Sequence, residues 1–301
     1  MAVSQREDIR IPSHGEQLAA YLYRPEAADR DAPCVVMAHG FSATRDDGLP
    51  GYAEAFRDAG LMVILFDYRH FGASTGQPRQ LLDIGRQLAD YRAVVAWARQ
   101  LDGVDPERIV LWGSSFSGGH MFALGATDPN LAAVIAQAPF TDGIPTLMRI
   151  PLKNVARLVY AGVRDQVGNW LGRPPHLIPA VGDPGTFAVM TAPDAKPGFE
   201  ALAPSESLWR NECTARVALR IALHRPALKA SQLKMPLLVC VCDNDSTTPA
   251  APAIKAAGRA PRGELRHYSC GHFDIYHIPQ AKTDQVAFLQ RVVHGVAAPG
   301  T

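Results

Sequence analysis

The sequence lacks the features that define several large classes of protein. No run approaches the ~20 apolar residues needed to span a bilayer, and the polar stretch from Met1 to Asp8 has no apolar signal-peptide core. The formal net charge is +1, and neither a run of Lys and Arg nor a basic-aromatic alternation occurs. These absences predict a cytoplasmic protein with no membrane insertion and no nucleic-acid partner.

Cysteine is also scarce. The five cysteines are an odd number and stand at scattered positions, so they do not form a disulfide framework, and we expect them to be reduced. Cys240 and Cys242 lie two apart on an apolar run and are predicted to be small core residues. Cys270 stands two residues before His272, which leaves a reactive thiol as an alternative to a buried one.

The stretch from Arg108 to His120 carries the strongest chemical signal. An apolar run, 109–112, leads into Gly113-Ser-Ser-Phe-Ser-Gly-Gly119 and then into a helical pattern. A serine flanked by small residues between a strand and a helix is typical of a nucleophile elbow, which projects the hydroxyl from a sharp turn. The alternative is a Gly/Ser-rich turn without chemistry.

Two serines fit this turn. Ser115 lies between Gly113 and Ser117, while Ser117 lies between Ser115 and Gly119. The nucleophile should follow the strand end by two or three positions, so the spacing favours Ser115 and places Ser117 in the helix.

A serine nucleophile needs a base and an acid that orients the base, and both are expected later in the chain. The buried strand predicted at 235–242 ends in a loop with Asp243 and Asp245, either of which also fits an Asx-turn or a helix cap. His272 follows a strand-like stretch at 265–268 and is the predicted base, with an ordinary loop histidine as the alternative. The order serine, acid, histidine favours the catalytic interpretation.

Backbone donors for an oxyanion are expected after the nucleophile and after an early strand. These positions are Phe116 and Phe41, the latter following the apolar run 33–38 and Gly40. His39 is interpreted as structural, because no second ligand stands at a spacing suited to zinc. The sequence therefore predicts no metal, and the chemistry needs no cofactor.

The hydrophobic pattern predicts an α/β fold. A hairpin around residues 13–16 is followed by regularly alternating strands and helices, which indicates a mainly parallel sheet flanked by helices. The expected strands are 34–38, 62–67, 109–112 and 133–137, and the expected helices are 51–59, 81–101 and 118–126.

Frequent prolines break this alternation and predict an inserted, largely helical lid. The lid spans 141–229, consists of short helical pieces, and divides a core made of 1–140 and 230–301, with the strand near Leu237 resuming beside 133–137. The apolar residues of the lid either roof the site or only hold the lid together. They are Trp170, Leu171, Ile178, Phe187, Met190, Phe199 and Trp209.

The lid also carries an excess of positive charge. It has 11 Arg and Lys against 7 Asp and Glu, a net 11 − 7 = +4. This charge fits an acidic substrate such as a coenzyme A or carrier-protein thioester, or else solvated helix faces, as expected for Arg216 and Arg220.

Taken together, these motifs resemble the α/β-hydrolase superfamily, specifically bacterial serine hydrolases related to dienelactone hydrolases and to the esterase and X-Pro-peptidase group. The resemblance covers most of the chain and adds the run from Asp67 to Ser74, whose role in such enzymes is usually architectural. It favours Asp245 as the acid, on its spacing to Pro249, and Asp243 as a supporting loop residue. Dienelactone hydrolases proper use a cysteine where this chain has Ser115.

The expected activity is cleavage of carboxylic esters through an acyl-enzyme formed with Ser115, His272 and Asp245. The expected partner is a small acyl substrate with an apolar part, and a homo-oligomer is compatible with the sequence. Thioester or lactone cleavage and acyl transfer use the same residues, while a peptidase and a non-catalytic binding protein are further alternatives.

Overall fold

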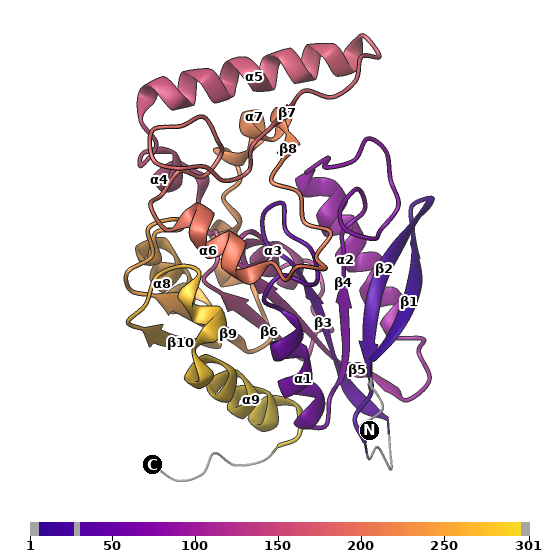
Figure 1. The fold of residues 1–301 in the computed structure, drawn as a ribbon. Coiled ribbons are helices and arrows are strands. Elements are labelled where there is room, and N and C mark those ends of the chain that lie inside the picture. Colours follow the sequence, from indigo (N-terminus) through magenta and orange to yellow (C-terminus); the bar gives the residue numbers. More distant parts are fainter. Residues whose placement is uncertain (1–5, 27–30, 296–301) are drawn as a thin grey trace.

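An eight-stranded mixed sheet forms the centre of the molecule (Figure 1). The computed structural model describes residues 6–26 and 31–295, so part of the polar amino-terminal stretch lies outside the described residues. The spatial order is β1-β2-β4-β3-β5-β6-β9-β10; β2 is antiparallel to both of its neighbours, β1 and β4, and all other neighbouring strands pair in parallel. The predicted α/β-hydrolase fold, a mainly parallel sheet with helices, is confirmed. The strands are β1 (Arg6–Ser13), β2 (Glu16–Tyr23), β3 (Ala32–Ala38), β4 (Met62–Phe66), β5 (Val104–Ser114), β6 (Ala133–Gln137), β9 (Leu237–Cys242) and β10 (Gly263–Tyr268).

Helices cover both faces of the sheet, because the strands are apolar on both sides. On one face, Val36, Leu111 and Val239 pack with the buried sides of α2, α3 and α8. On the other, Met37 and Trp112 pack with α1 and α9. The bounds are α1 (Pro50–Asp58), α2 (Ile84–Ala98), α3 (Phe116–Gly125), α8 (Ala250–Arg259) and α9 (Pro279–Val293).

Between β6 and β9 the chain leaves the sheet, and we call residues 138–236 the inserted segment. Most of it lies beyond one end of the strands, with α5 at the top of the view (Figure 1). β9 then pairs with β6 from Val134↔Leu237 onward, as the sequence predicts. The elements of the segment are α4 (Gly143–Leu147), α5 (Leu152–Trp170), β7 (Leu177–Ile178), α6 (Ala195–Leu202), β8 (Cys213–Thr214), η1 (Ala215–Val217), α7 (Ala218–Ile221) and η2 (Pro226–Gln232).

The prediction of only short helical pieces in this segment is wrong for α5, which has 19 residues. Pro151 precedes the helix and Pro174 follows it, and no proline lies between them. The other helices of the inserted segment are short. Within 6–26 and 31–295, no helix is both long enough and apolar enough to cross a bilayer.

Arg216 differs from its predicted role as a solvated helix residue. Its guanidinium donates to both oxygens of Asp165, whose side chain is fully buried, with the shortest contact at 2.6 Å. This ion pair joins α5 to η1. Arg220 is exposed as predicted.

Candidate active site

Ser115 stands on a sharp turn between β5 and α3. Its φ of 58° and ψ of −120° are strained for a residue with a side chain, as expected at a nucleophile elbow. Small residues permit the turn: a Cβ on Gly113 would lie 2.5 Å from the Ser117 carbonyl oxygen, and one on Gly119 would lie 2.1 Å from that of Phe140.

The structure separates the two candidate serines. Ser117 lies inside α3, is fully buried, and donates from Oγ to the Ala38 carbonyl oxygen at 3.0 Å. Its Oγ also lies 2.9 Å from the Tyr91 hydroxyl. Ser117 therefore ties α3 to the sheet, and Ser115 is the serine at the elbow.

His272 lies between Ser115 and Asp245. The distance from His272 Nε2 to Ser115 Oγ is 3.0 Å, and that from Nδ1 to Asp245 Oδ2 is 2.7 Å. The side chains of His272 and Asp245 are each 2% exposed. Three residues from separate strand ends thus form one hydrogen-bonded chain.

The turn after β9 shapes the surroundings of Asp245. The backbone N–H groups of Thr247 and Thr248 donate to its Oδ1 at 2.8 and 2.5 Å, and Thr248 Oγ1 donates to its Oδ2 at 2.9 Å. The sequence assigns no role to Thr248, although it lies between Asp245 and Pro249. Asp243 instead pairs with His267 at 2.7 Å on the surface.

The contact with Asp245 controls the protonation of the histidine. Burial alone lowers the pKa of His272, but the charge and hydrogen bond of Asp245 outweigh burial and hold that pKa above its ordinary 6.5. Burial would raise the pKa of Asp245, yet His272 and Thr248 hold it below its ordinary value. An ionised carboxylate only accepts hydrogen bonds, so His272 Nδ1 carries the proton and Nε2 is free to accept from Ser115.

Phe41 and Phe116 lie where oxyanion donors are needed. Phe116 is the first residue of α3, where a backbone N–H has no acceptor within the helix. A Cβ on Gly40 would lie 3.1 Å from Ser115 Cβ, so the chain leading into Phe41 passes close to the serine. The rings of Phe41 and Phe116 are in edge contact, with centroids 5.5 Å apart. Their role as donors stays a prediction.

His39 is buried behind this loop. Its Nδ1 lies 3.0 Å from the Gly40 carbonyl oxygen, and its ring packs edge-on against Tyr68. Burial lowers its pKa to about 4, so the ring is neutral at pH 7. These contacts fit the structural role predicted for it. Cys270 is buried too, and burial raises the pKa of its thiol, which does not favour the reactive alternative.

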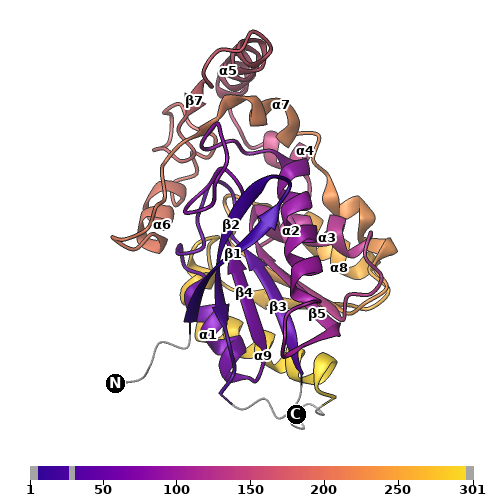
Figure 2. The same ribbon diagram turned by 90° about the vertical axis from the view of Figure 1, so that its right-hand side faces the viewer.

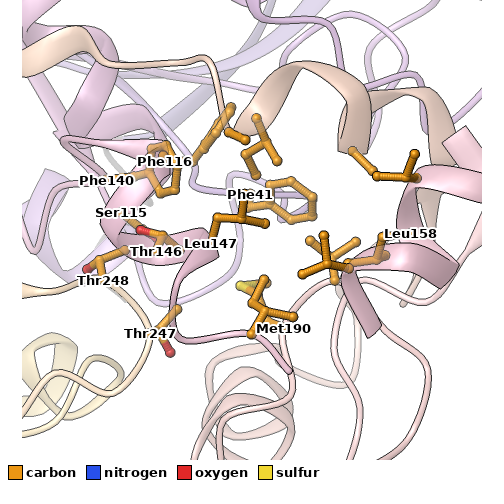
Figure 3. A pocket seen from close by; sticks show the side chains of 18 residues that line it. Phe41, Ser115, Phe116, Phe140, Thr146, Leu147, Leu158, Met190, Thr247 and Thr248 are labelled. Carbon is orange, nitrogen blue, oxygen red and sulfur yellow. The ribbon is translucent and has the colours of Figure 1, made fainter. Parts of the chain in front are cut away.

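An apolar cavity of ≈ 840 Å³, counting the space at its mouth, begins at Ser115. Figure 3 shows Ser115 and Leu158 at opposite ends of it, with Phe41 between them. The inserted segment supplies most of its wall. The lining residues are Phe41, Ser115, Phe116, Phe140, Gly143, Thr146, Leu147, Ile150, Val155, Leu158, Val159, Val189, Met190, Ala218, Ile221, Ala222, Thr247 and Thr248.

Of the two alternatives for the apolar residues of the lid, a roof over this cavity is wrong for most of them. Met190 does line the cavity, but Trp170 is 74% exposed at the end of α5, and Phe187 lies under the guanidinium of Arg157. The roof is built from α4, α5 and α7, whose aliphatic residues sequence reasoning did not single out.

A second, smaller cavity adjoins Ser115 on the side of His272. Met190 lines both cavities, and Phe199 lines the second. Here Asp47 accepts hydrogen bonds from the Thr44 N–H at 2.7 Å and from Ser207 Oγ at 2.6 Å, while burial raises its pKa to about 6. No sequence motif pointed to Asp47.

A buried hydrogen-bonded chain supports the elbow from behind. Trp112 Nε1 donates to Gln285 Oε1 at 2.7 Å, and Gln285 Nε2 donates to Gln137 Oε1 at 2.7 Å. Gln137 Nε2 donates to Ser114 Oγ at 3.2 Å, and Ser114 Oγ lies 2.7 Å from the Tyr276 hydroxyl. Ser114, the residue before Ser115, is thereby tied to α9.

The fold and this site define the class: the chain belongs to the α/β-hydrolase superfamily. A model of the X-Pro dipeptidyl-peptidase (S15) family matches residues 14–149. The chain is 43% identical over 289 residues, or 95% of each protein, to the quorum-quenching protein AidA of Acinetobacter baumannii (strain MDR-ZJ06).

Two further relatives are similar in sequence or structure. The chain is 31% identical to the polyketide transferase GrgF of Penicillium sp. over 202 residues, 65% of each protein. The crystal structure of the α/β-hydrolase GrgF from Penicillium sp. sh18 matches with a TM-score of 0.82 at 22% identity, over 96% of this chain and 99% of that one. Est1E of Butyrivibrio proteoclasticus, crystallised with ferulic acid, has a TM-score of 0.67 at 17% identity, over 95% and 99% of the chains.

Proposed function

We propose that this chain is a serine hydrolase that cleaves carboxylic esters, lactones included, through an acyl-enzyme. The observation that supports it is the chain of hydrogen bonds from Ser115 through His272 to Asp245, which opens into an apolar cavity. A lactone is a cyclic carboxylic ester, so the same attack opens its ring.

In this mechanism His272 Nε2 takes the Ser115 proton as Oγ attacks the acyl carbon. The backbone N–H groups of Phe41 and Phe116 hold the oxyanion of the tetrahedral intermediate. The histidine then donates the proton to the leaving oxygen, and water, activated by the same histidine, releases the acid. Asp245 keeps the ring oriented throughout.

The substrate has an apolar acyl part. The large cavity takes the acyl chain, and the smaller cavity beside His272 takes the leaving alcohol. The segment 141–229 serves as the lid, since its helices supply the cavity wall farthest from Ser115. The only carboxylate among the residues that line these two cavities within the described chain is Asp47, which favours uncharged over anionic leaving groups.

The test is turnover of p-nitrophenyl esters from acetate to palmitate by the wild type, Ser115→Ala and Ser117→Ala. We expect Ser115→Ala to lose roughly 10⁴-fold or more in kcat and Ser117→Ala to keep most of it. The wild type should prefer medium or long acyl chains. Equal activity of Ser115→Ala and wild type would remove the proposal, and the reverse ranking of the two variants would move the nucleophile to Ser117.

Acyl transfer to an acceptor other than water is the second candidate, and the likeness to a polyketide transferase favours it. Adding an alcohol or amine acceptor to the ester assay separates the two functions. With a hydrolase, the ratio of acyl-acceptor product to free acid should not exceed the molar ratio of acceptor to water. With a transferase, that product ratio should be far higher.

A further inference from the structure

The outer face of α5 is apolar and covered by no other part of the described chain. Side chains at about helical spacing stand on it with large exposed fractions, from 41% for Val167 to 82% for Leu152. Two are amphipathic aromatics, Tyr160 at 72% and Trp170 at 74%. We call this surface the α5 face; its residues are Leu152, Tyr160, Val163, Val167, Trp170 and Leu171.

Basic residues outnumber acidic ones along α5 and the segments that flank it. Residues 143–182 contain five Arg and Lys and one acidic residue. That acid, Asp165, has a fully buried side chain held by Arg216, so it adds no negative charge to the surface. The next acid along the chain, Asp183, is exposed but pairs with Lys196 at 3.1 Å. Lys153, Arg164 and Arg173 are exposed beside the apolar residues. The whole chain is nearly neutral at +1, so this basic region is local.

We propose that the α5 face docks this protein peripherally on an anionic lipid surface. A helix with Trp and Leu on one side and Lys and Arg around it is suited to the boundary between lipid headgroups and acyl chains. Each basic residue near an anionic leaflet adds to the attraction, and Tyr and Trp rings favour the headgroup level. The apolar and aromatic side chains and the basic side chains lie together on α5 and the turn that follows it.

A second copy of this chain is the less suitable occupant. In a two-fold contact through α5, the same basic residues of both copies would face each other with no exposed acid between 143 and 182 to offset them. Anionic headgroups supply the missing negative charge.

α5 separates the proposed docking surface from the apolar cavity. The opposite side of the helix, at Val155 and Leu158, forms a wall of the apolar cavity, and Val159 both lines the cavity and is 44% exposed. A docked molecule would therefore hold its acyl cavity one helix away from the lipid. Figures 1 and 2 both show α5 at the extreme end of the molecule, where a flat surface can reach it.

The test is co-sedimentation with vesicles of phosphatidylcholine alone or mixed with phosphatidylglycerol. Wild type should sediment with the mixed vesicles only, and about 1 M salt should weaken its binding, because that concentration screens charges beyond ~3 Å. Lys153→Glu/Arg164→Glu/Arg173→Glu should bind about tenfold more weakly or worse. Trp170→Ala/Leu171→Ala should also weaken binding.

The matched control is Lys255→Glu/Arg259→Glu/Arg262→Glu, which changes the net charge equally on α8 and the loop after it, away from α5. It should bind vesicles like wild type. All variants should hydrolyse p-nitrophenyl acetate as wild type does, which shows that they are folded and separates this proposal from the proposed function.

Three results would overturn the docking proposal. They are no sedimentation of wild type with mixed vesicles, equal losses in the α5 and α8 charge variants, and a lipid-free dimer that the α5 variants dissociate. The last result would assign the α5 face to a second copy.

Discussion

The carboxylate of Asp245 controls two properties of His272, its orientation and its protonation. It accepts a hydrogen bond from His272 Nδ1, with 2.7 Å between Nδ1 and Oδ2, and it is itself held by the N–H groups of Thr247 and Thr248. These contacts leave Nε2 directed at Ser115 Oγ. Asp245 therefore orients the His272 ring toward Ser115.

The pH dependence of kcat/KM follows from this environment. Protonated His272 cannot accept the Ser115 proton, so activity falls as pH drops through the pKa of His272 in the free enzyme. Asp245 holds that pKa above 6.5, and we expect the acidic limb of the profile to lie above pH 6.5. In Asp245→Asn the limb should move to lower pH, with a large loss of kcat. A wild-type profile that stays flat down to pH 4 contradicts histidine as the base.

Sequence reasoning could identify the residues that stand in local motifs. Ser115, Asp245 and His272 each follow a strand within a short recognisable loop, and the structure brings these three together. Asp47 reaches the site through tertiary packing, which leaves no local pattern to read. The sequence shows that Thr248 stands in the turn after Asp245, but it does not predict the hydrogen bond between the two side chains.

At the scale of elements, β5 and α3 hold Ser115, and α9 packs against the sheet below them. The chain Trp112–Gln285–Gln137 joins α9 to two central strands in a fully buried region. Buried polar groups of this kind are costly to leave without partners. The elbow is thus coupled to a helix far along the sequence.

Gln285→Leu should destabilise the protein. It leaves the Trp112 N–H and a Gln137 oxygen buried without their partners, at a cost of about 1–3 kcal/mol in the free energy of unfolding for each group. Urea unfolding measures the change. The control is Gln280→Leu, the same substitution at an exposed site of the same helix, which should stay within ~0.5 kcal/mol of wild type. Equal stability of the two variants would show that the buried chain contributes little.

The inserted segment shows where element prediction fails. Its prolines correctly mark the break in alternation, yet they conceal a 19-residue helix that fits between two of them. Arg216 and Arg220 look alike in the sequence, but only Arg216 meets the buried Asp165. That difference depends on how α5 packs on η1, and no spacing within either element reveals it.

At the scale of the whole molecule, the parallel sheet gathers residues from distant parts of the chain at one edge. Strand alternation is a local pattern, so the sequence predicted the parallel core and the return of β9 beside β6. The wall of the cavity instead combines α4, α5, α7 and the loop at Met190. Contacts among such irregular pieces are set by tertiary packing.

The far end of the cavity should determine acyl chain length. Leu158 stands opposite Ser115 in the cavity, so Leu158→Trp fills space that a long chain would occupy (Figure 3). We expect roughly tenfold or greater loss of kcat/KM on p-nitrophenyl palmitate and little change on the acetate. Parallel loss on both esters would indicate misfolding or a different acyl path, and a melting curve distinguishes these two.

Labelling of the folded protein with a fluorophosphonate, followed by intact mass measurement and peptide mapping, tests directly whether Ser115 is an activated nucleophile. We expect one adduct per chain on Ser115, with slow labelling of His272→Ala, because the serine needs its base. An unlabelled wild type, or an adduct on Ser117, would contradict the assignment of Ser115 as the activated nucleophile.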